Sequence, residues 1–380
     1  MGWISLVFRR HALLALGLAS GLAVAAPAPD IVLAHVAPYT GPLARDATDI
    51  GVGAQVAVDA VNAHGGVLGR KLRIIVADDH FKPDETVQLV RSMIGKASAL
   101  LPMTGTANID KVLKEGVLDR ATLPIVGIFP SPDFLRNSPN RNLFHIRAGD
   151  RDQMRKIIEE LTSVGITDIG LIAPNTPFGD AAVAVAEELL QAKKLTLKAH
   201  ATLVLGPKID LEPVLAKVQH KNLAAIILLS PPGISGAIVR GLRARGEGGM
   251  IIAMSYSDAN LIVRDAGKEF AHGVAIAQVF PNPANRSVPL VKEFREDFSK
   301  YAKTTDEPSF LNLEGYVSAK LIVEAIRRSR DPSAEGVRRG LEMLHNYDLG
   351  GYIVDFGPNK HIGSQFVDLS VIGAAGKLLY

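Results

Sequence analysis

The chain has 380 residues, enough for two domains with sizeable apolar cores, and 47% of them are hydrophobic. Charged residues make up 21%, and the formal net charge is +3 without a basic run. With a single Trp as well, a nucleic-acid-binding surface has little support. The absence of cysteine excludes disulfides, thiol catalysis and cysteine metal sites.

The N-terminus has the pattern of a secretory signal peptide. Arg9 and Arg10 precede an apolar run over residues 12–24, and Ala23-Val24-Ala25 matches a small-x-small cleavage site. We predict a signal peptide over residues 1–25 rather than a membrane span, because the apolar run is too short to cross a bilayer. A lipid anchor would need a cysteine at the cleavage site, so we expect a soluble protein in the periplasm.

Short β-rich runs alternate with helical patterns along the rest of the chain. The spacing is that of βαβ units, which predicts a parallel sheet with both faces covered by helices. The alternation restarts near Gly149 and predicts a second sheet of the same kind. Near the C-terminus, runs at 353–355 and 367–372 are predicted to form a hairpin through residues 357–360. The other expected strands include residues 31–36, 72–77, 125–128, 169–173, 197–203, 225–229, 251–254 and 274–279.

Residues 100–117 predict a strand, a Gly/Thr turn and the start of a helix. Leucines end an apolar run, Thr104-Gly105-Thr106 makes the turn, and apolar residues then recur at helical spacing. The first N–H groups of a helix have no helical partner, and the helix dipole favours negative charge. A carboxylate or phosphate therefore fits at this turn, beside the two threonine hydroxyls. The alternative is that Thr106 only caps the helix.

Other strands are followed by loops rich in Gly, Pro, Ser and aromatic residues. In an open α/β sheet, ligands bind beyond the carboxyl ends of the strands. Two sheets whose loops face each other would form a cleft between them. These loops are residues 129–132, 175–179, 230–233 and 255–258.

An ordered series of short motifs resembles the type I periplasmic solute-binding proteins of ABC importers, in the branched-chain amino-acid (Leu/Ile/Val) group. The resemblance covers essentially the whole mature chain. Residues 61–72 are close to that family's N-x-x-G-G-I-x-G-x-x-L. The other matching motifs are Thr40-Gly41-Pro42, Asp78-Asp79 with Pro83 beyond, Phe144-His145-Ile146-Arg147, Phe178-Gly179 and Leu349-Gly350-Gly351.

The resemblance implies an α/β fold of two Rossmann-like lobes joined by a hinge of three crossings. Lobe 1 would hold residues 31–147 and 276–345, and lobe 2 would hold residues 148–275 and 346–380. Such proteins enclose a small ligand as the lobes close and deliver it to an ABC permease in the inner membrane. They perform no chemistry and need no cofactor, and nothing in the sequence gives a reason to expect an oligomer.

In the family, the ligand carboxylate is held by the turn after the third strand and by a hydroxyl after the fourth. These positions fall here on Thr104-Gly105-Thr106 and on Phe129-Pro130-Ser131. The family's aromatic position in lobe 2 matches Phe178, where relatives often carry tyrosine. For Tyr39, the sequence supports two roles equally: lining the cleft or packing at the surface.

The loop 255–258 departs from the family's pattern. Relatives that bind amino acids place an acidic side chain there to pair with the ligand ammonium, whereas the best-matching position here has no acid. Asp258 either takes that role or caps the helix that follows. We therefore expect an aliphatic or aromatic carboxylic acid, held by the Thr and Ser residues with Tyr256, Phe129 and Phe178, to suit the site as well as an α-amino acid or better.

Other patterns that suggest chemistry have weaker support. Asp78 and Asp79 point to opposite faces of a strand end, which favours a structural role over a metal or catalytic pair. The histidines lack metal-ligand spacing, and no nucleophile–base pattern supports an enzyme. Arg147 is either a carboxylate fork or a brace at the hinge. The second functional hypothesis is an exported ligand sensor of the same fold that docks on a receptor or regulator.

Overall fold

The computed structural model describes residues 29–41, 43–129, 132–206, 209–219 and 221–379. The predicted signal peptide and Ser131 lie outside these residues. Within the described ranges, no helix has both the length and the apolar character needed to cross a membrane.

The N-terminal part of the chain forms a five-stranded sheet in which every pair is parallel. The interior strand β1 is buried on both faces apart from one residue, as expected for a parallel sheet covered on both sides. In spatial order the strands are β2 (Leu72–Asp78), β1 (Ile31–Ala37), β3 (Ala99–Leu100), β5 (Ile125–Val126) and β7 (Leu143–Phe144). A short parallel pair is formed by β4 (Met103–Thr104), which follows β3 in the chain, and β6 (Ile128–Phe129), which follows β5.

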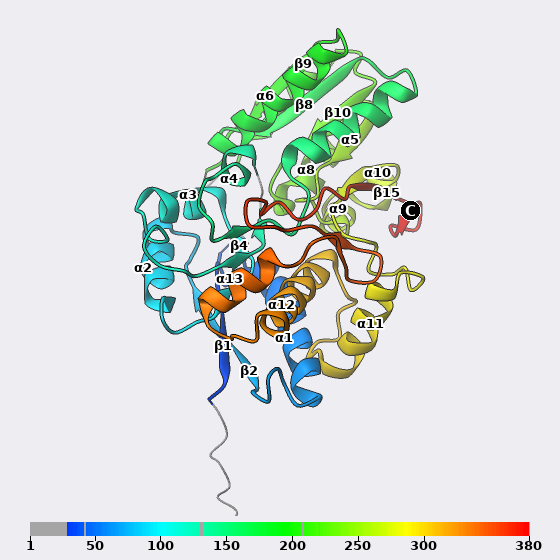
Figure 1. Cartoon of the computed structure of the whole chain (residues 1–380). Helices are drawn as coiled ribbons and strands as arrows, with labels where there is room; N and C mark the ends of the chain where they lie inside the picture. The colour runs from blue at the N-terminus through cyan, green and yellow to red at the C-terminus, as the bar shows by residue number, and fades with distance from the viewer. Residues whose placement is uncertain (1–28, 42, 130–131, 207–208, 220, 380) are drawn as a thin grey trace, which may run out of the picture.

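The second sheet has seven strands and lies apart from the first. In Figure 1 its green strands occupy the top of the molecule, above the blue and cyan first sheet. The strands pair in parallel from β9 to β12, and two antiparallel strands complete the edge. In spatial order they are β9 (Ala199–Leu203), β8 (Ile169–Pro174), β10 (Ala225–Leu228), β11 (Met250–Ala253), β12 (Ala275–Gln278), β15 (Asp368–Ile372) and β16 (Leu378–Leu379).

Helices cover both faces of each sheet, and each face has its own apolar core. One face of the first sheet packs against α2 (Pro83–Met93), α3 (Thr106–Lys114) and α4 (Asp133–Arg136), and the other against α1 (Ala44–Ala63), α11 (Pro289–Tyr301), α12 (Phe310–Ser329) and α13 (Ala334–Glu342). The second sheet packs against α5 (Asp150–Ser163) and α6 (Pro177–Ala192) on one face, and against α7 (Glu212–Val218), α8 (Pro232–Ala244), α9 (Ala259–Ala266) and α10 (Lys268–Ala271) on the other.

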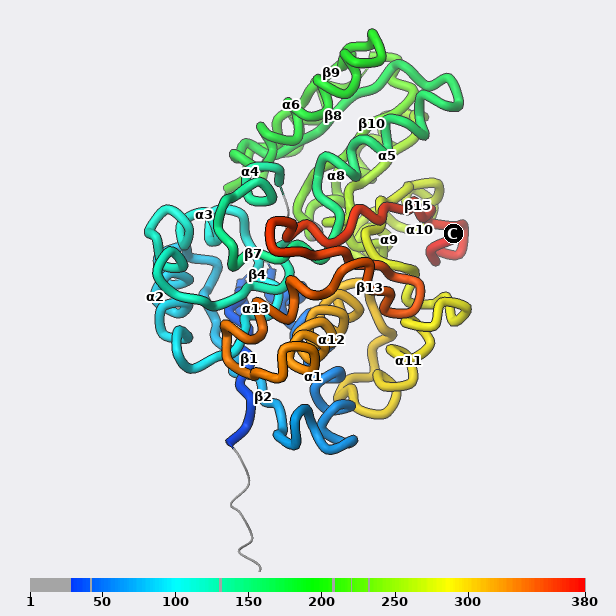
Figure 2. Tube along the Cα trace, viewed as in Figure 1, coloured from blue at the N-terminus to red at the C-terminus, as the bar shows by residue number. Residues whose placement is uncertain are grey.

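The C-terminal strands differ from the prediction, and the expected hairpin between 353–355 and 367–372 is wrong. Instead, β13 (Tyr347–Asp348) pairs with β14 (Ile353–Val354), and β15 returns to pair with β12. Figure 2 follows this red segment back to the second sheet. The tight turn lies at Gly350 and Gly351, whose φ angles of 102° and 92° favour glycine. Their N–H groups donate to Asp348 Oδ1, which fixes this turn.

The two-lobe division remains a proposal, and the strand pairing moves two of its boundaries. Strand β12 belongs to the second sheet, so the crossing that was placed at residue 276 follows Gln278. Tyr352, Val354 and Phe356 pack in the core of the first sheet, so the last crossing follows residue 356 rather than 345. Both predicted boundaries were displaced because nothing in the sequence of a short strand indicates which sheet it joins.

Close contact between α1 and α12 gives a first testable prediction. A Cβ atom on Gly315 would lie 1.9 Å from the carbonyl oxygen of Ile50, far inside van der Waals contact. We expect Gly315→Ala to destabilise the protein by about 1–3 kcal/mol, because the two helices must separate. The control is Gly233→Ala in α8, where the added atom would meet nothing within 4 Å. Thermal unfolding tests this, and equal melting temperatures for the two variants would contradict it.

Candidate ligand-binding site between the two sheets

The start of α3 is positioned by the β4–β6 pair. Thr104 pairs with Phe129 in this ladder, and the Gly105 N–H donates to the Phe129 carbonyl oxygen at 2.8 Å. Gly105 has φ of 100° and faces the Phe81 ring, which would lie 2.7 Å from an added Cβ. Glycine is therefore required for this turn, which leads directly into the first residue of the helix, Thr106.

The side chains of Thr104 and Thr106 each bring a hydroxyl to this turn. Both Oγ1 atoms are buried and have no hydrogen-bond partner among the described residues. Thr106 is the first helical residue rather than the cap, and no side chain caps α3. The alternative, in which Thr106 only caps its helix, is therefore wrong. Two hydroxyl donors and a helix N-terminus together favour an anion.

A cavity of about 480 Å³ adjoins this turn, a volume typical of pockets for small organic ligands. Loops after strands of both sheets line it, as the sequence predicts for facing sheets. From the first sheet's side the lining residues are Leu43, Asp46, Phe81, Thr104, Gly105, Thr106, Ala107, Asp110, Phe129 and Phe134. From the second they are Pro174, Thr176, Pro177, Phe178, Leu205, Gly206, Ile209, Ser230, Pro231, Ile234 and Tyr256.

Three aromatic rings, from the end of β6, the start of α6 and the loop after β11, form one wall of this cavity. Tyr256 lies between Phe129 and Phe178, with ring centroids 5.4 Å and 5.3 Å apart in edge-to-face geometry. The Tyr256 hydroxyl donates to Asp150 Oδ1, which leaves the ring edge toward the cavity apolar. The structure thus brings together the three aromatic residues that were proposed as ligand contacts.

Beneath this wall lies Arg147, which is only 1% exposed. Its guanidinium donates to Glu314 Oε2 at 3.2 Å and to Ser255 Oγ at 2.6 Å. The guanidinium carbon also lies 4.6 Å from the Phe129 ring centroid and 5.2 Å from that of Tyr256. Because Arg147 is absent from the cavity lining and joins α12 to the loop after β11, its contacts favour the brace over the carboxylate fork.

Two other predicted site residues, Tyr39 and Asp258, do not line the cavity. The Tyr39 hydroxyl bonds to His35 Nδ1 at 2.6 Å, and Tyr39 is not among the lining residues. Asp258 Oδ1 accepts from the Leu261 N–H at 2.8 Å and caps α9, so the capping alternative is correct. Asp258 also does not line the cavity. Ser131 lies outside the described residues.

The adjacent acids Asp78 and Asp79, at the end of β2, are structural, as predicted. Asp79 accepts from Thr86 Oγ1 at 2.7 Å and from Asn108 Nδ2 at 3.2 Å, which ties α2 and α3 together. Asp78 Oδ1 accepts from the backbone N–H groups of Tyr39 and His80. In the described part of the chain, no cluster of His, Asp and Glu could hold a metal ion.

Sequence reasoning missed Asp46, which lines the cavity near the start of α1. A signal was present, since Asp46, Ile50 and Ala54 recur at helical spacing on one buried face. Burial, together with the charge of Asp258, raises the pKa of Asp46 to about 7. Burial also raises the pKa of Asp150 to about 6, although the Tyr256 hydrogen bond and Arg147 oppose it.

These raised pKa values predict the pH dependence of stability. Between the ordinary aspartate pKa of 3.8 and about 7, folded Asp46 keeps a proton that the unfolded chain has lost. The unliganded protein therefore loses stability as pH rises through that window, and the loss ends once folded Asp46 ionises. We expect Asp46→Asn to remove this part of the loss. Melting temperatures at about pH 4 and about pH 8 test it, and parallel pH profiles for the two proteins would contradict it.

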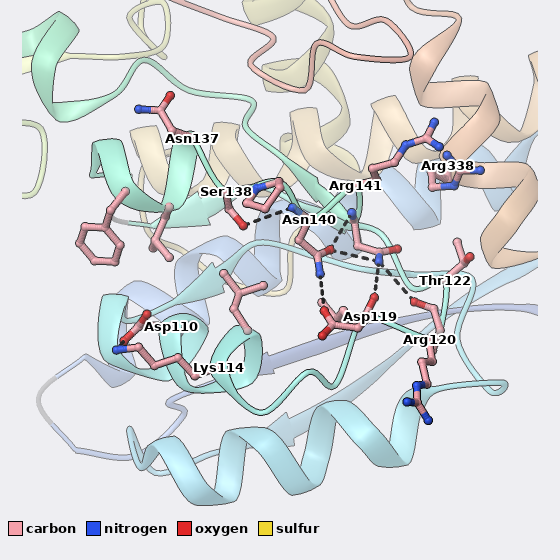
Figure 3. Close-up of a pocket in the computed structure, with 17 residues that line it drawn as sticks. Asp110, Lys114, Asp119, Arg120, Thr122, Asn137, Ser138, Asn140, Arg141 and Arg338 are labelled. Carbon is pink, nitrogen blue, oxygen red and sulfur yellow. Dashed lines mark hydrogen bonds and ion pairs between the residues drawn. The ribbon is translucent and has the colours of Figure 1, made fainter.

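A second hollow, of about 860 Å³, lies on the first sheet's side, between α3, the loop 118–122 and the loop 137–142. Figure 3 shows its polar side chains directed at one another: Asn140 bonds to Asp119 at 3.4 Å, and the Asn140 backbone N–H bonds to Ser138 Oγ at 3.3 Å. Arg338 is paired with Glu335 and Glu342. Because these groups satisfy each other, this hollow is a weaker ligand site than the cavity between the sheets.

The sequence profile of the periplasmic binding protein family matches residues 30–377. The chain belongs to that family. Among its relatives, a Leu/Ile/Val-binding protein homolog 7 from Brucella melitensis is 25% identical over 358 residues, which are 87% of this chain and 86% of the relative. The predicted resemblance to the Leu/Ile/Val-binding group of type I periplasmic binding proteins is confirmed.

Solved structures of this periplasmic binding protein family share the whole fold. A substrate-binding periplasmic protein from Ralstonia solanacearum is 31% identical and superposes with a TM-score of 0.85 over 92% of this chain and 99% of the other. An extracellular ligand-binding receptor from Verminephrobacter eiseniae is 28% identical, with a TM-score of 0.86 over 92% and 100%. The predicted α/β fold of two Rossmann-like units is therefore confirmed.

Proposed function

We propose that this protein is the substrate-binding component of an ABC importer and captures a small carboxylate-bearing solute between its two lobes. The observation that carries the proposal is that the buried hydroxyls of Thr104 and Thr106, at a helix start without a side-chain cap, have no hydrogen-bond partner among the residues that the structure describes. Burying a hydroxyl without a hydrogen-bond partner costs free energy. A ligand that accepts a hydrogen bond from each of the two threonines removes this cost when it binds.

The rest of the cavity fits the apolar part of such a solute. Phe129, Phe178 and Tyr256 form a wall, and Leu205, Ile209 and Ile234 line the second sheet's side. Because both sheets contribute contacts, a bound ligand favours the closed arrangement of the lobes. The role is binding and delivery rather than catalysis, in the periplasm and with an inner-membrane permease as partner.

Relatives support this role by name. The Brucella melitensis relative is called a Leu/Ile/Val-binding protein homolog, and the Ralstonia solanacearum relative a substrate-binding periplasmic protein. Export by the signal peptide at residues 1–25 belongs to the same proposal.

Thermal unfolding of the mature protein against a ligand panel tests the proposal. The panel pairs carboxylic acids with their primary amides, which keep the shape and lose the charge. A ligand that binds only the folded state raises the melting temperature by mass action. We expect acids to stabilise the protein and their amides to have no effect. Equal stabilisation by acid and amide would argue against a carboxylate site at Thr104 and Thr106.

A further inference from the structure

The cavity between the sheets is rich in aromatic side chains. Among the described residues that line it, five of 21 are aromatic, whereas aromatic residues make up 6% of the chain. Phe129, Phe178 and Tyr256 form the wall described above. The other two, Phe81 and Phe134, are 41% and 42% exposed, so solvent still reaches them. Apolar side chains gathered at an open cavity are typical of ligand-binding grooves.

Phe81 is held by a strained turn at the end of β2. The φ angles of His80 and Phe81 are 51° and 58°, and two consecutive left-handed residues that are not glycine are uncommon. Asp78 Oδ1 accepts from the His80 N–H at 2.9 Å, and Asp79 Oδ1 accepts from the Phe81 N–H at 3.0 Å. Two carboxylates thus hold a conformation that glycine would adopt at lower cost.

The Phe81 ring lies against the turn that starts α3. A Cβ atom on Gly105 would lie 2.7 Å from the Phe81 Cε2 atom, so the lack of a side chain at Gly105 leaves room for the ring. Asp79 also accepts from Asn108 of α3 at 3.2 Å, which joins the Phe81 turn to this helix. Because Phe81 remains 41% exposed, packing on Gly105 does not account for a ring of this size in a strained conformation.

Rings from two different elements therefore lie beside the Thr104-Gly105-Thr106 turn. Phe129 is the partner of Thr104 in the β4–β6 ladder, and Phe81 lies against Gly105. Both phenylalanines line the cavity. The first carbon atoms of a ligand whose carboxylate lies at this turn would be close to these rings. Aromatic rings that meet edge-to-face or offset-stacked gain free energy beyond their apolar area, which a saturated ring does not.

We propose that Phe81 selects ligands that carry an aromatic ring close to the carboxylate, by contacting that ring beside Gly105. This inference rests on the proposed function and narrows its ligand class to aromatic carboxylic acids. Phe81 is then a specificity-determining residue rather than a part of the anion site. Its strained turn fixes the ring before the ligand arrives, so little conformational entropy is lost when the ligand binds.

Matched pairs of acids test the inference in the mature protein by calorimetric titration. The pairs keep the charge and the ring size: benzoate with cyclohexanecarboxylate, phenylacetate with cyclohexylacetate, and 3-phenylpropanoate with 3-cyclohexylpropanoate. A saturated ring buries more apolar surface, so apolar area alone would favour the cyclohexyl acid. We expect the tightest aromatic acid to bind at least about fivefold more tightly than its cyclohexyl partner, which reverses that order.

The variant Phe81→Leu keeps an apolar side chain and removes the ring. We expect it to weaken binding of the aromatic acid about 3–10-fold and to leave binding of its cyclohexyl partner nearly unchanged. Phe81→Tyr keeps the ring and should keep the preference, which separates contact with the ring from a change in the turn. The control is Phe366→Leu, since Phe366 is 37% exposed but does not line the cavity. Its ligand preference should equal that of the wild type.

The outcomes separate this inference from the function on which it rests. If cyclohexyl acids bind the wild type as tightly as their aromatic partners, if Phe81→Leu keeps the preference, or if Phe81→Tyr loses it, selection by the Phe81 ring is refuted and the carboxylate site stands. If no aromatic acid binds at about 1 mM, the inference is likewise refuted, and the wider panel of acids and amides decides the function. If primary amides bind as well as the acids, both proposals fall. An aromatic preference that Phe81→Leu abolishes and Phe366→Leu keeps supports the inference.

Discussion

Replacing Arg147 with methionine is expected to destabilise the protein by about 3–5 kcal/mol, the largest effect that we predict. Arg147 and Glu314 have side chains that are 1% and 2% exposed, so the variant leaves a buried carboxylate without its cation. It also removes the hydrogen bond to Ser255 and the contact with the Phe129 and Tyr256 rings. Chemical denaturation of the unliganded protein measures the loss.

The double variant Arg147→Met with Glu314→Gln is the matched control. Removing the second charge relieves the uncompensated carboxylate, so we expect the double variant to recover most of the lost stability. A single variant that loses less than about 1 kcal/mol, as exposed ion pairs do, would show that Arg147 does not brace the two sheets.

Replacing Thr106 with valine is expected to weaken binding of a carboxylate ligand by about 1–3 kcal/mol, or roughly 5–150-fold. Valine keeps the shape of the side chain and removes the hydroxyl. Because that hydroxyl makes no hydrogen bond within the described residues, the stability of the unliganded protein should change little. Titration of the tightest ligand found in the panel measures the effect.

Two further variants define the result for Thr106. Thr106→Ser keeps a hydroxyl and should retain most of the affinity, which separates the hydrogen bond from the loss of a methyl group. Thr48→Val removes a hydroxyl that bonds to the Ala44 carbonyl on the exposed face of α1, and should leave affinity unchanged. An affinity for Thr106→Val equal to that of the wild type would remove this hydroxyl from the site.

The sequence predicted the strand, turn and helix that carry the proposed carboxylate site. The prediction rested on local properties: the alternation in the strand, the glycine with positive φ and the apolar spacing of the helix. Each of these depends only on residues close to Gly105. The order of βαβ units likewise predicted two parallel sheets with helices on both faces. Local patterns of this kind are reliable because neighbouring residues alone determine them.

The partners of short C-terminal strands could not be read from the sequence. Strand β14 has two residues, and its pairing with β13 depends on the turn at Gly350 and Gly351 rather than on its own composition. The apolar run near Leu369 was equally compatible with a local hairpin and with the edge of the second sheet, where it pairs with β12. Long-range pairing is chosen by the edge that the fold leaves open.

The sequence by itself determined the fold class, the family and the turn at Thr104-Gly105-Thr106, because these depend on local pattern and on ordered motifs. Only the tertiary structure decided which side chains share the cavity. It assigned Asp258 to a helix cap, Arg147 to a buried ion pair and Asp46 to the cavity wall. The physical reason is that the role of a charged residue depends on what folding packs around it, and those neighbours are distant in the chain.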